Sequence, residues 1–180
     1  MLMRAESSNL LIVDVQERLT PVMSDPRRVI SGCALLMRAA RRLEIPVIAS
    51  EQYPKGIGPT VFDLREWLPA EGAIPKLHFS CADEPALMDR LTATGRRQVV
   101  MAGIEAHICL LQSAIGLKEK GYEPFVVVDA SASRRPENEA AAWLRLRQAG
   151  IATVSAEMVL FEWLRVAGTP AFKELVALVK

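Results

Sequence analysis

Short, continuously apolar segments alternate with helical patterns along nearly the whole chain, and this alternation constrains the fold most. The apolar segments are rich in branched residues, as strands buried on both faces of a sheet are. We predict strands at residues 9–13, 45–50, 73–76, 98–103, 125–128 and 151–154. Strands that alternate with helices in this way form an α/β fold, in which a doubly wound, six-stranded parallel sheet lies between two helical layers.

The segments between the predicted strands carry helix start and stop signals. Asp25 followed by Pro26 begins one helix, and glycines at 95, 121 and 150 end three others. We expect helices over residues 26–43, 83–94, 104–120, 136–149, 157–166 and 170–179. Residues 51–69 form a long loop with one or two helical turns, and long loops in compact domains are often functional. No linker or repeat divides the chain, so we expect one domain over residues 1–180.

Charge and composition exclude several classes of partner. The net charge is +1 and acidic and basic residues are interleaved, so no broad positive field is available for nucleic acid. No apolar run approaches the roughly 18 residues of a membrane span, and the first apolar segment is too short for a signal peptide. Three cysteines far apart predict no disulfide framework. We expect a cytoplasmic protein that binds neither nucleic acid nor membrane.

Three chemically reactive residues follow predicted strands, where ligands of parallel sheets bind. Asp14 follows the first strand, Lys76 ends the third, and Cys109 lies just past the fourth, near the start of a helix. A thiol near a helix N-terminus and a cation is expected to have a lowered pKa, which makes Cys109 the candidate nucleophile. The alternatives are a buried packing cysteine, a turn aspartate and a surface lysine.

The other two cysteines have weaker claims to chemistry. Cys33 lies on an apolar helix face and is interpreted as a packing residue. Cys81 follows Lys76 closely in the sequence, and a reactive thiol there is the less favoured alternative to a loop cysteine without a chemical role.

Three segments carry a more specific signal: LLIVDVQERL, PKLHFSCA and VVMAGIEAHICLLQSAIGLKEKGYEPFVVVDASASR. In this order they resemble the isochorismatase-like cysteine hydrolases, a superfamily that includes nicotinamidases and carbamoylsarcosine amidases. The resemblance implies strand order 3-2-1-4-5-6 and a catalytic triad of Asp14, Lys76 and Cys109. It also implies a cis peptide bond between Ile104 and Glu105, which would direct the backbone amides of Glu105 and Cys109 at an oxyanion.

The activity implied by the resemblance is hydrolysis of an amide-type C–N bond in a small molecule. Asp14 would take the thiol proton, Lys76 would stabilise charge, and the Cys109 thiolate would form a thioester with the substrate. Nicotinamidases bind a metal through an aspartate and histidines after the second strand, but the corresponding loop here has no histidine. Since His78 and His107 are the only histidines and are far apart in sequence, we expect no metal and no cofactor.

Two further expectations concern the substrate pocket and the competing functions. Gln16 either orients substrate or Lys76, or is a surface glutamine. The other candidates for lining the pocket, each equally explained by packing, are Leu19, Tyr53, Phe79 and His107. The alternatives to an amidase are isochorismatase-type ether hydrolysis, which does not use a cysteine at the position of Cys109, and a catalytically silent binding or redox protein. The resemblance also implies a homo-oligomer.

Overall fold

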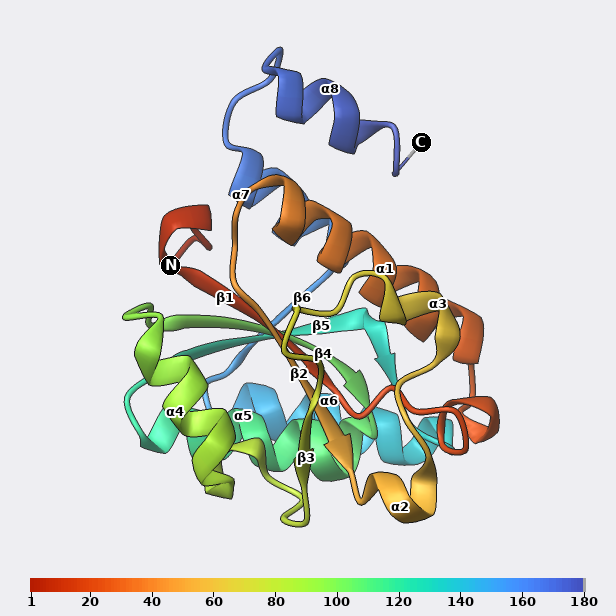
Figure 1. The fold of residues 1–180 in the computed structure, drawn as a ribbon. Helices are drawn as coiled ribbons and strands as arrows, with labels where there is room; N and C mark the ends of the chain where they lie inside the picture. Colours follow the sequence, from red (N-terminus) through yellow and green to blue (C-terminus); the bar gives the residue numbers. More distant parts are fainter. Residues whose placement is uncertain (180) are drawn as a thin grey trace.

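The computed structural model describes residues 1–179, which form a central sheet between two layers of helices (Figure 1). The sheet is parallel throughout, with six strands in the order β3-β2-β1-β4-β5-β6. The strands are β1 (Ser8–Val13), β2 (Val47–Gln52), β3 (Ile74–Lys76), β4 (Gln98–Ile104), β5 (Glu123–Ala132) and β6 (Ala152–Val154). The predicted three-layer fold and strand order are therefore confirmed.

Helices cover both faces of the sheet. The α-helices of the described chain are α1 (Pro26–Arg42), α2 (Pro54–Ile57), α3 (Phe62–Arg65), α4 (Pro85–Ala93), α5 (Leu111–Glu119), α6 (Pro136–Gln148), α7 (Ala156–Leu164) and α8 (Pro170–Val176). The shorter turns are η1 (Ala5–Ser7), η2 (Thr20–Val22), η3 (Cys81–Asp83) and the π-helical η4 (Ala106–Leu110). Helices α1 and α7 cover one face of the sheet, α4, α5 and α6 cover the other, and α8 lies outside α7 (Figure 1). No helix within residues 1–179 is long and apolar enough to cross a membrane.

The strand boundaries differ from the prediction at two places that matter for the site. β2 extends two residues further than predicted, through Gln52, because β3 pairs with its end in the register Gln52 to Lys76. β5 is much longer than the predicted residues 125–128. After an irregularity in its pairing with β4, it continues alongside that strand, where Ser131 pairs with Gly103.

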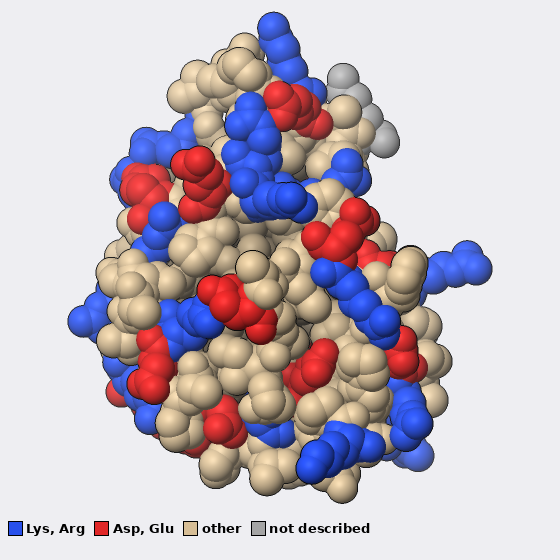
Figure 2. Space-filling model, in the orientation of Figure 1, with Lys and Arg blue, Asp and Glu red and all other residues tan. Residues whose placement is uncertain are grey.

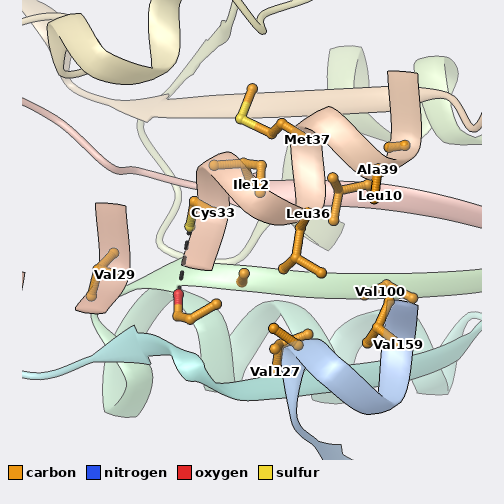
Figure 3. Close-up of a cluster of buried hydrophobic side chains, with 14 of the residues drawn as sticks. Leu10, Ile12, Val29, Cys33, Leu36, Met37, Ala39, Val100, Val127 and Val159 are labelled. Atoms are coloured by element: carbon orange, nitrogen blue, oxygen red, sulfur yellow. Dashed lines mark hydrogen bonds between the residues drawn. The ribbon is translucent and has the colours of Figure 1, made fainter. Parts of the chain in front are cut away.

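Two apolar clusters fill the space between the layers, one on each face of the sheet. Alternate residues of β1 serve different clusters, since Leu10 and Ile12 pack with α1 whereas Leu11 packs with α4 and α5. Cys33 points from α1 into the first cluster and donates to the Ala130 carbonyl at 3.5 Å (Figure 3). Burial raises the pKa of Cys33 to about 12. Cys33 is thus a packing residue with a protonated thiol.

Candidate active site

The carboxyl ends of β1 and β4 form the centre of the candidate active site. The strand order reverses between these two neighbours, which is where doubly wound sheets bind ligands. Asp14 follows directly after β1, and Cys109 lies in the π-helical turn that follows β4. Asp14 is completely buried and Cys109 is 5% exposed. The fold therefore brings a carboxylate and a thiol to one shielded place.

A glycine at the end of β4 lets these two strands approach closely. Gly103 pairs with Val13 and has a φ of 124°. A Cβ atom on Gly103 would lie 2.1 Å from the Val13 carbonyl oxygen, so no other residue fits there. Asp14 also has a positive φ, of 52°, which aspartate tolerates better than most residues. The backbone itself thus sets the approach of Asp14 to the Cys109 segment.

Lys76 enters the site from β3, the edge strand of the sheet. Pro75 precedes it, and an edge strand accommodates a proline because no ladder donor is needed on its outer side. Lys76 is 2% exposed, and its Nζ lies 2.8 Å from Asp14 Oδ2. A buried ammonium is costly unless it is paired and hydrogen-bonded, so the charge of Asp14 accounts for its presence.

Three oxygens accept the three N–H bonds of the Lys76 ammonium. They are Gln52 Oε1 at 2.5 Å and the carbonyls of His78 and Phe79 at 3.1 and 3.0 Å. Asp14 Oδ2, 2.8 Å from Nζ, forms an ion pair with the same ammonium. Burial is the largest single effect and lowers the pKa of Lys76, but the charge of Asp14 and the smaller effects of Cys81 and Cys109 together outweigh it, so the net shift is upward. Lys76 therefore stays charged beside the carboxylate of Asp14.

The Cys109 thiol has a raised pKa, which corrects the lowered value expected from the sequence. Burial raises the pKa most, and the negative charge of Asp14 raises it further. Lys76 acts in the opposite direction without outweighing them. A nearby cation and a helix end lower the pKa of a thiol, but desolvation of the buried thiolate raises it and is the larger effect here. In the resting site the thiol is protonated beside a charged carboxylate.

Gln52 belongs to this site, although it lies in a segment that was predicted to be a loop. It is the last residue of β2 and is 8% exposed. Its Oε1 accepts from Lys76 and lies 3.9 Å from Cys109 Sγ, and its Nε2 donates to the Leu77 carbonyl at 2.9 Å. The signal that identifies Asp14, a polar residue where a strand ends, also applies to Gln52, because β2 ends at Gln52 and not at Ser50.

Gln16 and Leu19 make contacts within the protein. The Gln16 amide donates to the carbonyls of Gln52 and Gly58 at 3.0 and 2.6 Å, and its oxygen accepts from the Gln52 N–H at 2.8 Å. Gln16 is completely buried, so it is not a surface residue. Its side-chain hydrogen bonds join backbone groups and do not involve Lys76. Leu19 packs against the apolar cluster that includes α1.

The remaining predicted pocket residues lie at the same end of the sheet. Tyr53 and Lys76 help to line a cavity of about 510 Å³, and Tyr53 is half exposed. Phe79 is half exposed, and its carbonyl accepts from Lys76. His107 is partly buried in the π-helical turn, with its Nδ1 2.8 Å from Ser133 Oγ. These side chains stay candidates for contact with a substrate.

The segment before Cys109 has a distinctive backbone. The peptide bond between Ile104 and Glu105 is cis, at the position that the family resemblance indicated. The Glu105 carboxylate, which is nearly buried, accepts from the backbone N–H and the Nε of Arg134 at 3.2 and 3.0 Å. Glu105 thereby ties the start of the Cys109 turn to the segment after β5.

Comparison with known proteins places this arrangement in a family. The sequence model of the isochorismatase domain matches residues 8–158. The chain belongs to the isochorismatase family. Zebrafish isochorismatase domain-containing protein 2 is 39% identical over 172 residues, which cover 94% of this chain and 85% of the relative. Mouse isochorismatase domain-containing protein 2A is 35% identical over 176 residues, which cover 97% and 84%. As a member of this family, the chain is a hydrolase.

Solved structures of isochorismatase-like proteins share the fold over nearly the whole chain. The MAR1 ribonuclease from Caenorhabditis elegans is 34% identical with a TM-score of 0.92, covering 99% of this chain and 92% of that one. YcaC from Pseudomonas aeruginosa, solved with hexane-2,5-diol and covalent acrylamide, is 26% identical with a TM-score of 0.92 and coverages of 98% and 91%.

Proposed function

We propose that this isochorismatase-family hydrolase cleaves a C–N bond of a small amide-type substrate through a thioester on Cys109. The observation that carries the proposal is the buried carboxylate of Asp14. One of its oxygens forms an ion pair of 2.8 Å with the Lys76 ammonium, and Cys109 is close enough for the Asp14 charge to raise the pKa of the thiol. Such a site keeps a thiol protonated at rest and holds a base ready beside it.

The proposed reaction begins when an amide carbonyl reaches Cys109. Asp14 Oδ2 takes the thiol proton as Sγ attacks the carbonyl carbon, and the negative charge moves to the carbonyl oxygen. The amides of Glu105 and Cys109 stabilise this oxyanion, and donors of this kind are worth about 2.7–4 kcal/mol each. Asp14 returns its proton to the leaving nitrogen, ammonia departs, and a thioester remains. Lys76 stays protonated throughout and balances the charge of Asp14.

Hydrolysis of the thioester completes the cycle. Asp14 takes a proton from a water molecule, which attacks the thioester carbonyl, and the proton passes to the departing Cys109 sulfur. The products are a carboxylic acid and the resting thiol. Asp14 serves as the base in both half-reactions, because in each one it accepts a proton and then donates it to the leaving group.

The chemistry is proposed to proceed without a metal ion. Within residues 1–179, no three His, Cys, Asp or Glu side chains are grouped as a metal site requires. His78 contacts Glu84 at 3.3 Å and His107 contacts Ser133, so both imidazoles have other partners. The residues present in the site therefore do not fit the metal site of nicotinamidases.

The comparisons support covalent chemistry on a small molecule. The acrylamide in the Pseudomonas aeruginosa relative is covalent, as expected for a protein with a reactive nucleophile. Another relative is called a ribonuclease, but the surface of this chain does not favour RNA. Lys and Arg side chains alternate with Asp and Glu over the visible face (Figure 2), and the net charge is only +1.

An ammonia-release screen tests the proposal. Small amides, ureides and carbamates are incubated with the wild type, Cys109→Ala and the matched control Cys33→Ala, which removes a buried thiol outside the site. We expect at least one compound that releases ammonia with the wild type and Cys33→Ala but not with Cys109→Ala. Turnover that survives Cys109→Ala and is abolished by Asp14→Asn would instead favour the ether-hydrolase alternative. The absence of any turnover would favour a binding protein.

A further inference from the structure

The two carboxylate oxygens of Asp14 have different neighbours. Those of Oδ1 are residues that the proposed mechanism does not yet include. Oδ2 faces Lys76, whereas Oδ1 accepts a hydrogen bond of 2.7 Å from Ser50 Oγ. Ser50 ends the section of β2 that pairs with β1, opposite Val13, and its carbonyl accepts from the Asp14 N–H at 3.1 Å. Ser50 therefore holds both the backbone and the side chain of Asp14.

The Cys81 thiol contacts the Ser50 hydroxyl. Cys81, in the turn η3, places its Sγ 3.6 Å from Ser50 Oγ, within reach of a sulfur hydrogen bond. Its own backbone is fixed by Ser113, whose Oγ accepts from the Cys81 N–H at 2.8 Å. Cys81 and Asp14 have no exposed surface and Ser50 has 1%, so bulk water does not compete for these bonds.

The direction of the bonds follows from the donors available. A serine hydroxyl has one proton, and Ser50 gives it to the carboxylate, which only accepts. Ser50 Oγ can then only accept from Cys81, so the thiol is the donor. Burial first, and the charge of Asp14 next, raise the pKa of Cys81 to about 11, so its thiol carries the required proton at neutral pH. The chain runs from Cys81 to Ser50 to Asp14 Oδ1.

We propose that Ser50 and Cys81 are positioning residues for Asp14, forming a one-way hydrogen-bond chain that turns Oδ2 toward Lys76 and Cys109 and stabilises the carboxylate form. This inference deepens the proposed function, since it rests on Asp14 as the base. The charged and titratable groups that face Asp14 are Lys76 from β3, Cys109 from η4 and Cys81 from η3. Ser50 is the neutral donor that completes its surroundings.

The carboxylate of Asp14 can be titrated directly, without any substrate. Protein labelled with ¹³C at aspartate carboxyl carbons is followed by NMR from pH 3 to pH 8, and the resonance missing from Asp14→Asn identifies Asp14. In Ser50→Ala the carboxylate loses a donor that favours its charged form, so the titration midpoint moves to higher pH by roughly 1 to 2 units. The matched control Ser8→Ala, which changes a buried serine at the opposite end of β1, leaves the midpoint unchanged.

Variants at Cys81 test whether the groups act as a chain. Cys81→Ala moves the midpoint upward by less than Ser50→Ala, and Cys81→Ser, which keeps a donor, restores it. The double variant Ser50→Ala/Cys81→Ala shifts no more than Ser50→Ala alone, because Cys81 acts only through Ser50. If Ser50→Ala does not fold, the comparison of alanine with serine at position 81 decides the question.

The proposal is overturned if the midpoint in Ser50→Ala equals that of the wild type, or if serine and alanine at position 81 behave alike. Neither result bears on ammonia release. A shifted midpoint in a protein that hydrolyses no amide would leave the chain of contacts standing and reject the proposed function. An unshifted midpoint in a protein that hydrolyses an amide would reject the chain of contacts and leave the proposed function standing.

Discussion

Lys76 Nζ lies 2.8 Å from Asp14 Oδ2, and neither side chain has any exposed surface. This pair joins the edge of the sheet to its centre, since Lys76 comes from β3 and Asp14 follows β1. Each charge is tolerated in the interior because of the other. The consequences for stability and for catalysis can be measured separately.

Removal of one member of the pair leaves the other charge buried and unpaired. Lys76→Met is expected to lower the free energy of unfolding by about 3–5 kcal/mol, measured by urea denaturation. The double variant Asp14→Asn/Lys76→Met should be more stable than Lys76→Met alone, yet remain inactive. At the exposed Arg42–Glu174 pair, Arg42→Met serves as the control and leaves the unfolding curve nearly unchanged. Additive losses from Asp14→Asn and Lys76→Met would contradict the pairing.

Gln52 is expected to contribute to activity through Lys76. Gln52→Ala removes the acceptor at 2.5 Å from Nζ and leaves one ammonium proton without a partner, so kcat should fall by roughly 10- to 100-fold on an amide found by the screen. Gln98→Ala is the matched control, because Gln98 is a buried glutamine at the start of β4, far from the carboxyl ends of the strands. Equal losses of kcat in the two variants would reject a specific role for Gln52.

Gly103 is expected to be intolerant of even the smallest side chain. Gly103→Ala combines a left-handed backbone with a contact of 2.1 Å to the Val13 carbonyl, for a loss of about 2–6 kcal/mol in unfolding free energy. Gly72 also has a positive φ, of 77°, but no atom lies within 4 Å of a Cβ added there, so Gly72→Ala should cost only about 1–2 kcal/mol. Chemical denaturation of both variants checks this difference. A Gly103→Ala variant as stable as Gly72→Ala would contradict the close approach of β1 and β4.

The buried thiols make the protein less stable at alkaline pH. The folded-state pKa is raised to about 12 for Cys33 and to about 11 for Cys81, and it is also raised for Cys109. A raised pKa means that the folded chain keeps protons that the unfolded chain loses above about pH 8.5, so stability is complete below that pH and is lost as pH rises. Each thiol contributes a slope of at most about 1.4 kcal/mol per pH unit.

Urea denaturation between pH 8 and pH 10.5 measures that slope. Cys33→Ala is expected to be less stable than the wild type near pH 8 because it leaves a small cavity, but its stability should fall less steeply as the pH rises. A slope unaffected by Cys33→Ala would show that this thiol does not carry the raised pKa that its burial implies.

The fold was predictable from the sequence because its signals are local. Apolar runs such as residues 9–13 and 98–103 identify the central strands, and the helices between them require a parallel sheet. Strand exits then identify Asp14, Lys76 and Cys109 as candidates. The end of β2 was less predictable, because Glu51 and Gln52 are polar and only their pairing with β3 makes them a strand.

Properties that depend on three-dimensional surroundings were not accessible from the sequence. The apolar periodicity of residues 106–119 is the same for a π-helical turn followed by α5 as for one continuous helix, so the turn that carries Cys109 was missed. The direction of the Cys109 pKa shift was wrong because burial and the charge of Asp14 act across space. The contact of Ser50 with Asp14 also joins residues 36 positions apart.

The central claim, a thioester on Cys109, is tested most directly by mass spectrometry of a quenched reaction. The wild type is mixed with an amide from the screen, quenched in acid within milliseconds to seconds, digested and mapped. We predict a peptide containing Cys109 that is heavier by the mass of the substrate minus ammonia, and that disappears as the substrate is consumed. Turnover with no adduct on Cys109 at any time, together with undiminished turnover by Cys109→Ala, would contradict the account.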